Sequence, residues 1–75
     1  MSISDVMIHI REPLSREARA ALETRLRGVE GVIAPRFNPG TEHLLLVAFN
    51  PAKTRPAELR GVVRAAGHGA KLVGV

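Results

Sequence analysis

The order in which the hydrophobic pattern changes its period is the feature that most constrains the fold of this chain. Apolar residues alternate with other residues over 5–10, which predicts a strand that ends before Pro13. Apolar residues then recur every three or four positions, and this spacing predicts a helix over 15–27. We expect Ser15 to be the N-cap of this helix and Gly28 its C-cap.

Two further strands are predicted after this helix. The segment 31–38 contains Pro35, and proline has no N–H to donate to a neighbouring strand, so we expect this strand at an edge of the sheet. Residues 39–41, Pro-Gly-Thr, have the composition of a turn. The segment 43–49 is apolar from Leu44 onward, which is typical of a buried central strand.

The last part of the chain returns to a helix followed by a strand. Thr54 and Pro56 are typical of a helix start, with Thr54 as the capping residue of a helix over 56–66, and a short strand over 70–75 follows. The complete order is two βαβ units, each with a right-handed crossover. We therefore expect a single domain over 1–75 of the α+β class. Its fold would be a ferredoxin-like βαββαβ sandwich, a four-stranded antiparallel sheet with two helices on one face.

The composition excludes several classes of protein. The chain has no cysteine, which rules out a disulfide framework, a zinc finger and a catalytic thiol. Its longest apolar run, Leu44–Phe49, is far shorter than the roughly 20 residues that a membrane span needs. The first residues lack the regions of a signal peptide, so we expect a cytoplasmic protein. No nucleophile elbow, phosphate-binding loop or acid–base pair is recognisable, and we therefore expect no enzymatic activity.

The net charge of +4 suggests nucleic-acid binding as one possible function. The basic residues are spread along the chain, however, without a run of like charges. A sheet that binds RNA stacks bases on exposed aromatic side chains. This chain has no Tyr or Trp, and we expect Phe37 and Phe49 in the core. Nucleic-acid binding is therefore kept as an alternative rather than as the preferred function.

Three segments of the sequence carry a resemblance to a known family. Gly31-Val32 follows the first helix, Phe49-Asn50-Pro51-Ala52-Lys53-Thr54 precedes the second, and Ala66-Gly67-His68-Gly69-Ala70 follows the second. Their joint spacing resembles the heavy-metal-associated domain, the module of copper chaperones and of the N-terminal tails of metal-transporting P-type ATPases. The resemblance covers nearly the whole chain and implies the ferredoxin-like fold described above.

The family binds soft metal ions through Met-x-Cys-x-x-Cys between the first strand and the first helix. Thiolates in this position suit Cu(I) and are kept ionised by the helix dipole. Aligned on Gly31-Val32, the Met position of the motif falls on Pro13 and the two Cys positions fall on Ser15 and Ala18. The resemblance therefore implies a degenerate member of the family that has lost its metal ligands and needs no cofactor.

Three histidines leave a second function open, metal binding through imidazole instead of thiolate. His68 occupies the turn that the family builds as Ala-Gly-Tyr, beside the former metal loop. His9 and His43 lie on strands that the family topology makes neighbours, so they form a weaker candidate pair. None of the three has the fixed spacing of a metal motif, and a polar surface role is the simpler interpretation.

The preferred interpretation is a non-enzymatic protein-interaction or regulatory module in metal transport or homeostasis. The resemblance implies a protein partner such as a metal-transporting ATPase or a homologous domain. The expected partner surface is the former metal loop, the first helical turn and the neighbouring turn, with residues Pro13, Leu14, Ser15, Arg16, Arg19 and His68.

A second copy of the chain is a further possible partner. Alternate residues of the apolar strand, such as Leu44 and Leu46, would face the side of the sheet that the helices leave open. Exposed apolar area often marks a contact surface. The alternative is a face that is only partly apolar and has no such role. A homodimer could form through this open sheet face or through an edge strand.

Overall fold

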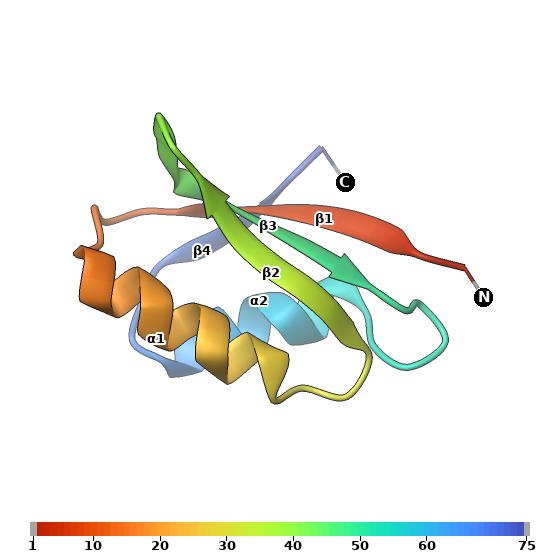
Figure 1. The fold of residues 1–75 in the computed structure, drawn as a ribbon. Coiled ribbons are helices and arrows are strands. Elements are labelled where there is room, and N and C mark those ends of the chain that lie inside the picture. The colour runs from red at the N-terminus through yellow and green to blue at the C-terminus, as the bar shows by residue number, and fades with distance from the viewer. Residues whose placement is uncertain (1, 75) are drawn as a thin grey trace.

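The computed structural model describes residues 2–74 and has the predicted order of strands and helices (Figure 1). The elements are β1 (Ser4–Ile10), α1 (Arg16–Arg27), β2 (Val32–Asn38), β3 (Thr41–Phe49), α2 (Pro56–Ala65) and β4 (Ala70–Val73). Within residues 2–74 no helix has the length and apolar character required to cross a membrane.

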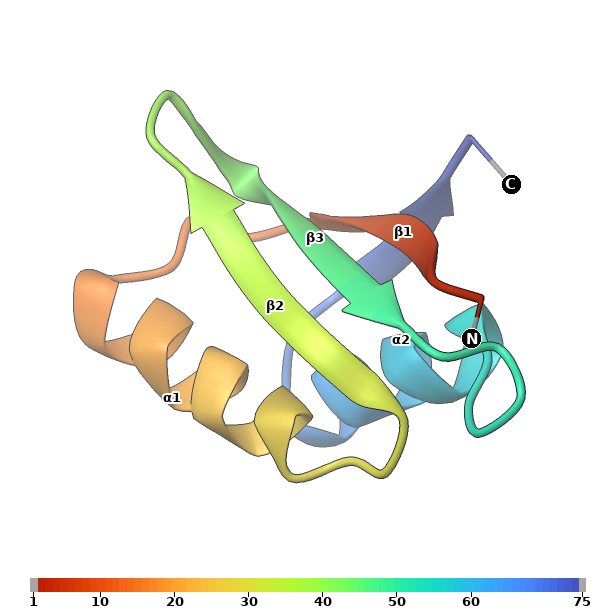
Figure 2. The ribbon, with the colours of Figure 1, turned by 45° about the vertical axis from the view of Figure 1, so that its right-hand side comes forward.

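The strands form one antiparallel sheet in the order β2-β3-β1-β4. Both helices lie on the same face of this sheet, as two views of the ribbon show (Figures 1 and 2). The ferredoxin-like sandwich is therefore confirmed. β3 is a central strand, and β2, which contains Pro35, lies at an edge as predicted. β4 forms the opposite edge.

The core lies between the sheet and the two helices. Alternate residues of β1 and β3 point into it, whereas each helix contributes residues four positions apart, as its period requires. Among residues 2–74, ten hydrophobic residues are buried there: Val6, Ile8, Ile10, Leu22, Leu26, Leu45, Val47, Phe49, Leu59 and Val63. Phe37 is partly buried and packs against this cluster, so both phenylalanines are in or beside the core.

The ends of several elements differ from the prediction. β3 begins at Thr41 instead of residue 43, because β2 and β3 are joined by a tight hairpin in which Gly40 has a φ of 84°. The proposed capping role of Thr54 is wrong. Arg55 is the N-cap of α2 and makes no side-chain cap bond, while the buried Thr54 hydroxyl donates to a Glu58 carboxylate oxygen at 2.7 Å.

Two of the three segments that carry the family resemblance lie against each other. The Asn50 N–H donates to the Gly31 carbonyl at 2.7 Å. Gly31 has a φ of 98°, and a Cβ built on it would lie 2.6 Å from the Cβ of Lys53. The glycine is therefore required by both its backbone conformation and its close neighbour. The two segments are therefore in direct contact at one end of the sheet.

Candidate functional site

The loop before α1 is fixed to the start of that helix. The Ser15 hydroxyl accepts the Ala18 N–H at 3.1 Å, which confirms Ser15 as the N-cap. The guanidinium of Arg19 donates to the Leu14 carbonyl at 2.7 Å, and Leu14 itself packs against the core. Pro13, Ser15 and Arg16 remain exposed. The loop therefore has a defined conformation and presents a small, partly basic surface.

The same loop is tied to the turn between α2 and β4. The carboxylate of Glu12 accepts the Gly69 N–H at 2.7 Å from one oxygen and 3.2 Å from the other. The Arg11 N–H donates to the Gly69 carbonyl at 2.9 Å. A Cβ at Gly69 would lie 2.9 Å from the Cβ of Arg11, so the two segments are as close as a glycine allows.

His68 belongs to the third segment of the family resemblance and is half-buried in this turn. It lines a groove of about 220 Å³ between the helices, with Ala18, Ala21, Leu22, Arg25 and Ala66. His68 and Ala18 thus share one groove, but Ser15 is not part of its lining. The groove offers one imidazole and one guanidinium, and a single imidazole is too small a ligand set for a specific metal site.

The structure also brings His9 and His43 together. Their rings are stacked, with centroids 6.1 Å apart and planes inclined by 17°. The Nδ1 atom of His43 lies 3.2 Å from the Ile10 carbonyl oxygen, so one nitrogen of this ring is already engaged. Across residues 2–74, no group of three or more His, Cys, Asp or Glu side chains is placed to hold a metal ion.

The open face of the sheet is partly apolar, as the sequence indicated. Leu44 and Leu46 are half-buried rather than fully exposed. A shallow groove of about 200 Å³ crosses this face between Asp5, Leu46 and Arg36. Charged residues therefore interrupt the apolar area.

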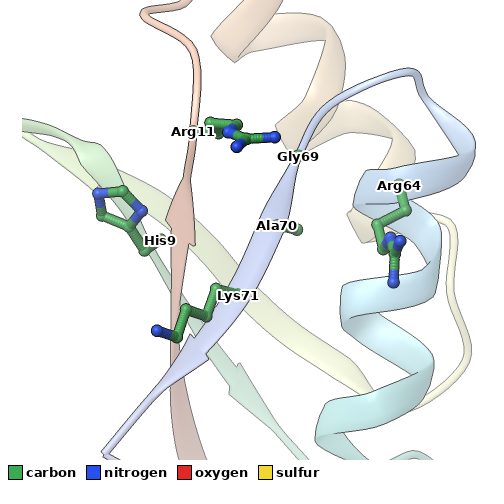
Figure 3. Close-up of a pocket in the computed structure, with 6 residues that line it drawn as sticks. All are labelled: His9, Arg11, Arg64, Gly69, Ala70 and Lys71. Atoms are coloured by element: carbon green, nitrogen blue, oxygen red, sulfur yellow. The ribbon is translucent and has the colours of Figure 1, made fainter.

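A basic depression at the β4 edge was not anticipated from the sequence. It has a volume of about 440 Å³ and is lined by His9, Arg11, Arg64, Gly69, Ala70 and Lys71 (Figure 3). Three of these side chains are cations, and no carboxylate is part of the lining. The only available signal was the net charge of +4, because the residues are up to 62 positions apart and no local motif joins them.

Comparison with known proteins shows the fold and leaves the family open. No protein-family model and no curated protein matches the chain. Among solved structures, oxidized MerP from Ralstonia metallidurans CH34 is 19% identical, with a TM-score of 0.84 over 96% of this chain and 99% of that one. A copper-binding domain from HMA7, a P-type ATPase, is 16% identical, with a TM-score of 0.84 over 93% of both chains.

A third solved structure is the N-terminal domain of a potential copper-translocating P-type ATPase from Bacillus subtilis in its Cu(I)-loaded state. It is 22% identical, with a TM-score of 0.84 over 95% of this chain and 88% of that one. The three likenesses extend over almost the whole chain. They show that this sequence adopts the same fold as these domains.

Proposed function

We propose that this chain is a non-enzymatic protein-interaction or regulatory module of metal transport or homeostasis that has lost the thiolate metal site. One observation carries the proposal. The fold is shared with copper-binding domains of P-type ATPases, yet the expected thiolate positions hold Ser15, the N-cap of α1, and Ala18, in the first turn of that helix. A neutral hydroxyl and a methyl group are poor ligands for a soft cation.

The proposed partner surface is the exposed loop and first turn of α1, with Pro13, Leu14, Ser15, Arg16 and Arg19, and with His68 beside it. The bond from Arg19 to the Leu14 carbonyl supports this surface, because a preorganised loop loses less entropy on binding. The guanidinium of Arg16 is exposed and suits an acidic partner. The partner class is a metal-transporting ATPase or a homologous domain, met in the cytoplasm.

A Cu(I) titration against a chromophoric chelator tests the loss of the metal site. We expect no Cu(I) uptake by the wild-type chain. The double variant Ser15→Cys/Ala18→Cys should bind one Cu(I), because Ser15 and Ala18 lie in one helical turn and the Ser15 side chain already reaches the Ala18 backbone. Ser15→Cys alone, the control, should bind Cu(I) far more weakly.

The same titration, repeated with Zn(II), separates this proposal from metal binding through histidine. Stoichiometric binding by the wild-type chain that disappears in His68→Ala, or in His9→Ala, would contradict the loss of metal function. It would favour an imidazole site instead.

An NMR titration tests the partner surface. The probe is the purified soluble metal-binding domain of a metal-transporting ATPase from the same organism. We expect the largest amide shifts at Leu14, Ser15, Arg16 and Arg19, and weaker binding by Arg16→Glu. Arg36→Glu is the control, because Arg36 lies on the edge strand β2, outside the proposed surface, and its replacement makes the same change in charge. Shifts confined to other surfaces, or none at all, would refute the proposed surface.

A further inference from the structure

The free edge of β4 combines unpaired backbone groups with a basic depression. We propose that this edge binds an extended acidic segment of another protein, which adds to the sheet as a fifth strand. The inference goes beyond the proposed function, because it concerns a different surface from the loop before α1. It rests on the direction of the backbone groups, on the charges around them and on a comparison with the other edge of the sheet.

The backbone of β4 points hydrogen-bonding groups outward. Residues of an antiparallel strand alternately direct their N–H and C=O groups toward one side and the other. The Gly69 carbonyl accepts a bond from the Arg11 N–H, so the backbone groups of Gly69 face β1. The backbone N–H and C=O of Lys71, two positions later and paired with His9, face β1 as well. Ala70 and Leu72 therefore direct their N–H and C=O groups away from β1. Within residues 2–74, β4 has no strand on that side.

Cationic side chains lie on both sides of this outward-facing backbone. Figure 3 shows the side chain of Lys71, a residue of β4, extending toward β1. The side chain of Arg64, on α2, lies on the other side of β4. Arg11 lies at the start of the strand pair and completes the lining of the 440 Å³ depression. No salt bridge among residues 2–74 involves these three cations. An extended segment at this edge would place carboxylates near cations on both of its faces.

The opposite edge of the sheet is less suited to strand addition. β2 contains Pro35, which offers no N–H, and its pairing with β3 is irregular at two places. Prolines and bulges are common ways of protecting an edge from further pairing. β4 has neither feature, so its backbone is the more available template.

The same charges disfavour a second copy of the chain at the β4 edge. If two copies paired through β4, the cations that line the depression of each copy would be brought close to those of the other. Like charges that face each other across a strand pair are destabilising. The chain also carries a net charge of +4, so two copies repel each other at long range. An acidic partner experiences the opposite effect.

An NMR titration of the full chain with a synthetic peptide tests the proposal. The probe is an acetylated and amidated octapeptide, Glu-Glu-Thr-Thr-Glu-Glu-Thr-Thr, which places carboxylates on both faces of an extended chain. We expect it to shift the amides of residues 69–73 and to slow hydrogen exchange at Ala70 and Leu72, whose N–H groups gain acceptors. The same peptide with Gln in place of Glu should bind about tenfold more weakly, because the cations lose their partners.

Charge reversal supplies the matched variants. Arg64→Glu/Lys71→Glu should weaken binding of the Glu-Thr peptide about tenfold, as expected for two exposed ion pairs. Arg36→Glu/Arg55→Glu makes the same change in net charge at exposed positions elsewhere and should bind nearly as the wild type does. Amide spectra of all variants establish that each remains folded.

Three outcomes would overturn the proposal. The first is binding of the peptide without slower exchange at Ala70 and Leu72, which would leave charge attraction alone. The second is equal weakening by both double variants. The third is preferential binding of a dT12 oligonucleotide over the peptide, which would favour nucleic acid. None of these outcomes bears on the proposed loop surface, which is tested by the amide shifts of Leu14–Arg19. The two proposals can therefore be supported or refuted separately.

Discussion

Glu12 performs with its side chain the role that a backbone carbonyl has in a regular strand pair. Its carboxylate accepts the Gly69 N–H where β1 and β4 separate, and it joins the loop before α1 to the turn after α2. A buried or half-buried N–H that loses its acceptor costs free energy. The carboxylate therefore helps to hold the loop in position, together with the bond from the Arg11 N–H to the Gly69 carbonyl.

Replacement of this carboxylate should lower stability. We expect Glu12→Ala to reduce the free energy of unfolding by about 1–3 kcal/mol, measured by urea denaturation, because the Gly69 N–H loses a charged acceptor. Glu30→Ala is the control, since its ion pair with Lys53 is exposed and should contribute about 1 kcal/mol or less. Equal losses in the two variants would show that the bond to Gly69 is unimportant.

Gly31 permits a comparison of backbone strain with steric overlap. Gly31→Ala should destabilise the fold by about 2–4 kcal/mol, because the new Cβ adds a close contact with Lys53 to a left-handed backbone conformation. Gly40→Ala places a Cβ in open space at a similar φ and should cost only about 1–2 kcal/mol. Thermal or urea unfolding measures both. If the two costs are the same, the contact with Lys53 has no energetic role.

At the scale of elements, every strand and helix could be predicted from the sequence. The period of the apolar residues predicted β1 and α1, and proline, turn and helix-start signals with one apolar run predicted the others. The ends were harder, because single hydrogen bonds determine them. Ser15 caps α1 as its residue type indicated, but Thr54 bonds to Glu58 and Arg55 precedes α2 without a side-chain cap. Thr54 is buried because the loop before α2 packs against the rest of the fold. The burial of this side chain could not be predicted from the local sequence alone.

α2 contains a glycine that its helix does not need. Gly61 lies inside the helix and is exposed, and a Cβ there would meet nothing within 4 Å. Gly61→Ala should therefore raise the free energy of unfolding by about 0.5–1 kcal/mol, because alanine loses less backbone entropy in a helix. Urea unfolding measures the change. A loss of stability would contradict this prediction, because it would mean that the added Cβ contacts another group unfavourably.

At the scale of the whole molecule, a chain without cysteine is held together by its hydrophobic core, which has ten buried residues within the described part of the chain. The candidate surfaces were predictable to different degrees. The surface at the loop before α1 could be proposed from the sequence, because most of its residues are contiguous and the family resemblance points to that loop. The basic depression could not, because β1, α2 and β4 bring His9, Arg64 and Lys71 together only after the chain has folded.

The stability of the molecule should not depend on a metal ion. We expect excess EDTA to leave the midpoint of thermal unfolding of the wild-type chain unchanged. A ligand that binds only the native state stabilises it according to its occupancy, and this chain has no cysteine thiolate to bind one. Ser15→Cys/Ala18→Cys loaded with Cu(I) is the positive control, whose midpoint should rise and then fall when a Cu(I) chelator is added. A drop in the wild-type midpoint with EDTA would indicate a bound metal.

The pairing of Met7 with Val73 and of Ile10 with Ala70 also has a mechanical consequence. β1 starts and β4 ends at the same side of the sheet, so a pulling force on the two ends would act across this strand pair and not along it. Hydrogen bonds loaded in that direction break one after another, from Val73 toward Ala70, whereas bonds loaded in shear resist together. Under tension the strand pair would separate progressively, and the two bonds made by Gly69, with the Arg11 N–H and with the Glu12 carboxylate, would be the last to break.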